Sequence, residues 1–68
     1  MKSEELKRIV PKWATSVGHK AAVMALLRQG VGYTTAVFLV KGTYKSELKD
    51  RLITLLYKAM GDYINKQP

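Results

Sequence analysis

The chain has 68 residues, and its 12 Lys and Arg against 5 Asp and Glu give a formal net charge of +7. A chain of this length folds as one domain with a small core, because short chains bury a smaller fraction of their surface. The absence of cysteine excludes disulfides and thiolate metal sites, and the single His19 cannot hold a metal without several carboxylates beside it. We therefore expect helix packing to supply the stability, with no metal or cofactor.

A first helix is predicted from Ser3 to the residue before Gly18. Ser3 is expected to cap its N-terminus, and two acids follow in the first turn, where carboxylates interact favourably with the helix dipole. Apolar residues then recur at helical spacing, which makes Trp13 a core residue. Pro11 leaves two alternatives, because it has no N–H for the helix: the helix kinks there, or a new helix starts at Pro11.

A second helix is predicted from His19 to Gln29, where strong helix formers dominate. Gly30 is the expected C-terminal cap. Gly30 and Gly32 flank Val31, and both glycines permit a sharp turn with positive backbone angles.

The next segment, Tyr33 to Lys41, is rich in β-branched and aromatic residues that favour strands. We nevertheless predict a helix, because the run is short and lies between Gly32 and Gly42. A lone strand would also leave its backbone groups unpaired, since the chain offers no partner strand.

The last long helix is predicted to begin at Ser46 as N-cap and to end at Gly61. One stripe of apolar residues on it is expected to enter the core: Leu48, Leu52, Leu55, Leu56 and Ala59. A second apolar line runs beside the first: Ile53, Tyr57, Met60 and Ile64. The second line is either a wide core face or a dimer surface.

All of the net positive charge comes from residues 6–46, which contain seven bases and no acid, whereas bases and acids balance in the remainder. Such a segment is expected of a surface that faces a polyanion such as nucleic acid. The alternative is that the lysines serve solubility alone. The polar, acidic start is unlike a secretory signal, and Arg28 interrupts the only long apolar stretch, so we expect a cytoplasmic protein with no membrane span.

A set of features surrounds the two central glycines: a turn glycine, an apolar residue after it, a small polar pair, two buried positions at helical spacing and a closing glycine before the last helix. They are Gly30, Val31, Thr34 with Thr35, Ala36 with Leu39, and Gly42. Over roughly residues 18–60 this pattern resembles the lambda-repressor and Cro-like helix-turn-helix family.

The resemblance implies an all-α, compact domain of four or five helices with a helix-turn-helix, whose recognition helix enters the major groove of double-stranded DNA. The implied base-facing residues are Tyr33, Thr34, Val37, Phe38 and Lys41. The predicted phosphate contacts are His19, Lys20, Thr43, Tyr44 and Lys45. Because this helix has no Arg, Asn or Gln, readout is expected to depend on apolar contacts, DNA shape and phosphate positioning.

The sequence thus predicts a DNA-binding transcriptional regulator of phage or plasmid type, acting as a repressor and as a homodimer through the last helix, with no small-molecule ligand. No enzyme is expected, because neither a nucleophile motif nor a phosphate-binding glycine motif is present. If Val37 and Phe38 lie in the core, the alternative is a protein-interaction module that uses the face from Tyr33 to Val40. A cationic membrane-active peptide is a third reading.

Overall fold

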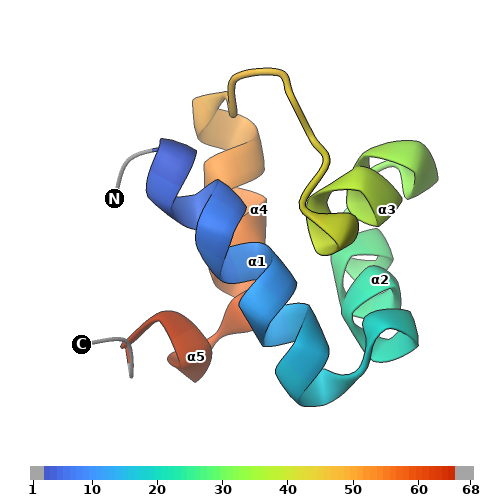
Figure 1. The fold of residues 1–68 in the computed structure, drawn as a ribbon. Helices are drawn as coiled ribbons and strands as arrows, with labels where there is room; N and C mark the ends of the chain where they lie inside the picture. The colour runs from blue at the N-terminus through green and yellow to red at the C-terminus, as the bar shows by residue number, and fades with distance from the viewer. Residues whose placement is uncertain (1–2, 66–68) are drawn as a thin grey trace.

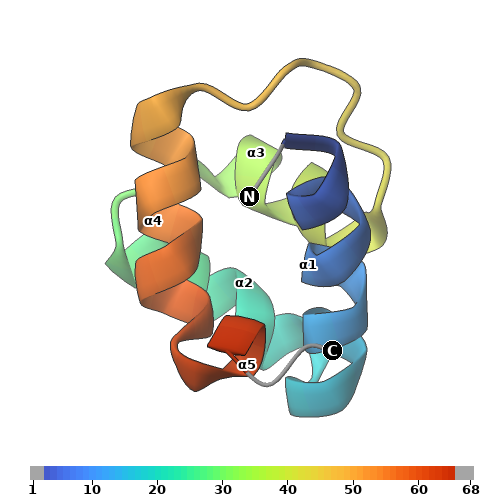
Figure 2. The same ribbon diagram turned by 90° about the vertical axis from the view of Figure 1, so that its left-hand side faces the viewer.

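Five helices form the part of the chain that this computed structural model describes, which is residues 3–65 without the side chains of residues 62 and 65. They are α1 (Ser3–Val17), α2 (His19–Arg28), α3 (Tyr33–Lys41), α4 (Asp50–Met60) and α5 (Asp62–Asn65). No strand occurs in these residues, which confirms the prediction of an all-helical chain. Helix α4 lies behind α1 in Figure 1, with α2 and α3 to the right, and Figure 2 shows α1 and α4 on opposite sides with α5 at their lower end.

One apolar core joins all five helices. Within the described residues every buried side chain is apolar, and Trp13 is among them, as predicted. The core residues are Leu6, Val10, Trp13, Ala14, Ala22, Leu26, Val31, Ala36, Leu39, Val40, Leu48, Leu56, Met60 and Ile64. Stability therefore rests on burial of apolar surface, at roughly 25 cal/mol per Å² removed from water.

Helix α1 runs through Pro11 as one element, so the alternative of a new helix starting at Pro11 is wrong. Pro11 instead meets the end of α3. A Cβ atom added to Gly42 would lie 3.1 Å from Pro11 Cγ, and Gly42 has a φ of +78°, which a residue without Cβ adopts readily. The close approach of these two residues fixes the C-terminal end of α3 against α1.

The turn of residues 29–32 joins α2 to α3. Gly30 has the predicted positive φ of +91°, but Gly32 has a φ of −62°, so the prediction of a positive angle there is wrong. The reason is that Gly32 is already the extended N-cap of α3, while Val31 turns into the core and its N–H donates to the Leu26 carbonyl at 3.1 Å. Helix α2 ends at Arg28, one residue before the predicted end.

Gly32→Ser is expected to stabilise the protein by about 0.5–1 kcal/mol, because serine can accept the N–H bonds of the first turn that no side chain accepts now. Space is available, since nothing lies within 4 Å of a Cβ atom at this position. Urea unfolding monitored by circular dichroism measures the effect.

Gly18→Ser is the matched control for that substitution. Gly18 is also an N-cap without a side-chain bond and has equally open surroundings, but its φ is +98°. Serine at residue 18 is strained and destabilises the protein. Equal effects of the two substitutions would contradict the capping argument.

The segment of residues 43–49 connects α3 to α4, and its structure corrects the predicted start of the last helix. Ser46 is not the N-cap: α4 begins at Asp50, with Lys49 as its N-cap. Leu48 enters the core from outside the helix, and its N–H donates to the Ser3 hydroxyl at 3.1 Å. Ser3 therefore binds this segment and is the first residue of α1, not the residue before it.

The second apolar line of the last helix is part of the core. Met60 and Ile64 are buried, and Ile53 and Tyr57 are half-buried against the core. The line therefore contributes to a wide core face, which is one of the two predicted alternatives. Helix α4 ends at Met60 before Gly61, as predicted, and Ile64 belongs to α5.

Candidate nucleic-acid interface

Helix α3 presents one face to solvent, and that face consists of the five residues predicted to meet the bases. Tyr33 and Phe38 have exposed fractions of 66% and 46%, Thr34 and Lys41 are exposed, and Val37 is half-buried. We call these five residues the α3 face. Phe38 therefore points to solvent and not into the core, and Val37 lies at the boundary.

The opposite side of α3 anchors the helix. Ala36, Leu39 and Val40 are buried and pack where α3 meets α1 and α2. This division follows from the helical period of 3.6 residues, which places residues 36, 39 and 40 on one side. Helix α3 is therefore anchored in the core on one side, while the α3 face on the other side is open to solvent.

The C-terminal end of α3 is closed by backbone hydrogen bonds. The N–H of Gly42 donates to the Leu39 carbonyl at 3.2 Å, and the N–H of Thr43 donates to the Phe38 carbonyl at 3.0 Å. The Thr43 hydroxyl donates to the same Phe38 carbonyl at 3.5 Å. The backbone of Phe38 is thus held at a well-bonded helix end.

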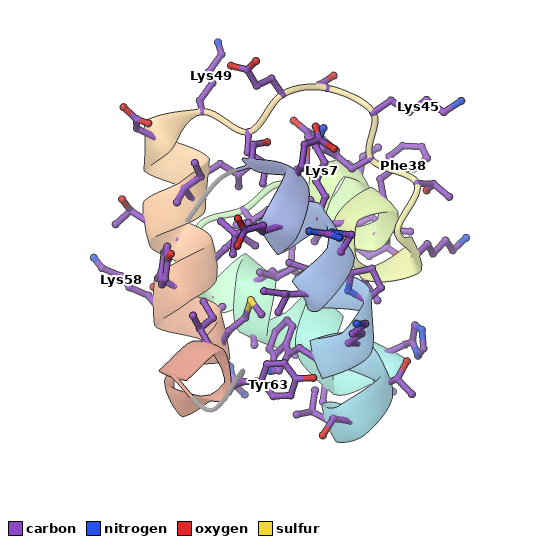
Figure 3. The ribbon with its side chains drawn as sticks, turned by 60° about the vertical axis from the view of Figure 1, so that its left-hand side comes forward. Lys7, Phe38, Lys45, Lys49, Lys58 and Tyr63 are labelled. Carbon is purple, nitrogen blue, oxygen red and sulfur yellow. The ribbon has the colours of Figure 1, made fainter. Side chains whose placement is uncertain are left out.

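The predicted phosphate contacts fall into two groups in the structure. Thr43 and Lys45 are exposed in the segment directly after α3, and Figure 3 shows Phe38 and Lys45 projecting on the α3 side of the molecule. His19 and Lys20 are exposed at the start of α2, at the end of that helix far from the turn. Only Thr43 and Lys45 therefore follow directly on the helix that carries the α3 face.

Tyr44 has a structural position that the sequence did not predict. It is half-buried against the core, and Lys7 Nζ lies 5.9 Å from the centre of its ring. A cation near an aromatic ring at this distance is attracted to the ring face. The ring therefore packs between the connecting segment and α1, whereas the sequence suggested a surface contact.

The basic segment, residues 6–46, keeps most of its cations on the surface. Six of its seven bases are exposed: Arg8, Lys12, Lys20, Arg28, Lys41 and Lys45. The seventh, Lys7, lies 3.7 Å from the Glu4 carboxylate, and this is the one ion pair among the side chains that the structure describes. The exposed cations therefore have no carboxylate partner there and are available to an external polyanion.

A groove of about 450 Å³ lies beside this surface and was not predicted. It is formed by the turn of residues 29–32, the segment after α3 and the first half of α4, and Thr35, Tyr44, Arg51, Leu52 and Leu55 are among its lining residues. These residues come from separate parts of the chain. No spacing pattern could have brought them together before the path of residues 43–49 was known.

Over the described residues, no helix combines the length and apolarity needed to cross a membrane. No protein-family model matches the chain, and no curated protein or solved structure matches it significantly. The likeness to the Cro-like family accordingly remains a prediction from the residues that carry it.

Proposed function

We propose that this protein is a sequence-specific DNA-binding transcriptional regulator that inserts α3 into the major groove as the recognition helix of a helix-turn-helix. The proposal is supported above all by the α3 face, which lies solvent-exposed on a helix whose flanks carry unpaired cations. An α-helix fits the width of the major groove, and lysines near its end reach the phosphates on either side.

The residue types on the α3 face and directly after it indicate which part of the DNA each side chain would contact. Lys41 and Lys45 supply charge for phosphates, while Tyr33, Thr34 and Phe38 have the shape and polarity for base edges. Phosphate contacts give affinity without sequence information, so discrimination among sequences falls to a few side chains and to DNA shape.

We further propose that the protein acts as a repressor, in the cytoplasm where bacterial and phage operators lie, and as a homodimer through α4. Leu52 and Leu55 on α4 are half-buried in the groove, and their remaining apolar surface is available to a second copy. A two-fold dimer reads two half-sites about 34–36 Å apart, and occupation of such an operator blocks transcription by steric exclusion.

Titration of a fluorescent DNA duplex across a range of salt concentrations tests the proposal. The affinity is expected to fall linearly with salt on logarithmic axes, by a slope of about 0.9 for each neutralised phosphate. Selection from a random pool of duplexes then tests sequence specificity. An affinity that does not decrease with salt, or no binding at low salt, would contradict DNA binding.

A second candidate is a protein-interaction module that uses the same helix. The exposed rings of Tyr33 and Phe38 favour it, because aromatic side chains are enriched at the centres of protein interfaces. The two functions differ in the role of the cations: a protein partner that binds through the rings alone tolerates high salt, whereas DNA does not.

A further inference from the structure

The α3 face has an unusual chemical character for a helix that reads bases. Residues 33–41 include no Arg, Asn or Gln, the side chains that make paired hydrogen bonds to guanine or adenine. Its two most exposed large side chains are aromatic, and the residue next to Phe38 is the aliphatic Val37. The apolar part of this face can recognise apolar groups on DNA, beside the polar contacts that Thr34 and Lys41 can make.

The major groove offers one apolar group at the base edges, the C5 methyl of a pyrimidine. Thymine carries this methyl, whereas uracil and unmodified cytosine do not. 5-Methylcytosine carries it at the same ring position. Contact between a phenyl ring and a methyl group lowers the free energy, because both apolar surfaces leave water.

Phe38 is the best-placed residue on the α3 face for such a contact. It lies one helical turn after Thr34, so the two side chains stand on the same side of α3. Its backbone is fixed by the two bonds from Thr43, and its ring projects away from the body of the molecule (Figure 3). The backbone that carries the ring therefore needs no rearrangement when the ring packs against a base.

We propose that the α3 face reads the C5 methyl groups of pyrimidines in the major groove, with Phe38 as the principal contact. This inference rests on the proposed DNA-binding function and names the DNA that it selects: duplexes with thymine or 5-methylcytosine at the contacted positions. Each methyl group that the α3 face covers is expected to increase the affinity about fourfold, because the free energy of burying one apolar carbon corresponds to this factor.

Four alternating duplexes of equal length test the inference by fluorescence anisotropy at one salt concentration. Two contain adenine paired with thymine or with uracil, and two contain guanine paired with cytosine or with 5-methylcytosine. The methyl-bearing member of each pair is expected to bind at least about fourfold more tightly. The same direction in both pairs separates the methyl group from other differences between A·T and G·C.

The substitution Phe38→Ala assigns the effect to this ring. It is expected to remove the methyl preference while the salt dependence stays, because the cations are unchanged. Val17→Ala is the matched control, since Val17 on α1 has an exposed fraction of 47% against 46% for Phe38. The control is expected to keep the preference.

The outcomes separate this inference from the function on which it rests. Equal binding of methylated and unmethylated duplexes by the natural sequence overturns methyl reading while DNA binding stands, and this comparison requires no variant. A methyl preference that survives Phe38→Ala overturns the assignment to Phe38. Failure to bind any of the four duplexes at low salt overturns both the inference and the proposed function.

Discussion

Leu26→Ala is expected to lower the free energy of unfolding by about 3–5 kcal/mol, which leaves the protein largely unfolded at room temperature. Leu26 is fully buried in α2, at the point where the carbonyl of the same residue accepts the N–H of Val31. Its removal opens a cavity between α2 and the turn that precedes α3. A domain of this size has only a few kcal/mol of stability to lose, so the effect is large.

Urea unfolding and the helical circular dichroism signal measure this loss. Leu27→Ala is the matched control, because Leu27 is the neighbouring leucine on the same helix and is only half-buried. The control is expected to cost clearly less. A loss at Leu26 of less than about 1 kcal/mol would contradict its central place in the core.

Replacing Lys41 and Lys45 together by Gln is expected to weaken DNA binding by roughly a hundredfold at about 0.1 M salt, since each lost phosphate contact costs nearly tenfold under these conditions. Both lysines are exposed: Lys41 belongs to the α3 face, and Lys45 lies in the segment directly after α3. The slope of affinity against salt is expected to become shallower by about 0.9 for each contact. Anisotropy titrations over several salt concentrations give both quantities.

Lys49 and Lys58, replaced together by Gln, form the control pair. This change removes the same two charges, but from α4 and its N-cap, in the part of the chain where acids balance bases. Figure 3 shows Lys58 projecting on the side opposite Phe38 and Lys45. A similar loss of affinity for both pairs would mean that net charge, and not the surface around α3, determines binding.

Helix α3 shows how far the sequence was sufficient to predict the fold. The β-branched and aromatic residues of this segment favour a strand, but the segment is a helix. The flanking Gly32 and Gly42 and the lack of a partner strand indicate the helix correctly. The division of α3 into buried Ala36 and Leu39 and exposed Phe38 also follows from helical periodicity. The glycines and the periodicity are local features, whereas the lack of a partner strand is a property of the whole sequence, and both can be read without the structure.

The structure of the segment after α3 could not be predicted from the sequence. Ser46 is a good capping residue, yet residues 43–49 form no helix, because Leu48 packs in the core and bonds to Ser3. Tyr44 likewise has a packing role that depends on Lys7 of a distant helix. Both cases depend on contacts between parts of the chain that no local pattern relates.

The hydrogen bond from Leu48 to Ser3 joins residues 45 positions apart. Because closing so long a loop has an entropic cost, the contact forms only when both ends of the domain are in place, and the connecting segment is ordered together with α1. Lys45 lies in that segment, so the fold places its backbone before any ligand arrives. Binding a polyanion there requires little further ordering of the chain, which favours a fast and salt-sensitive encounter.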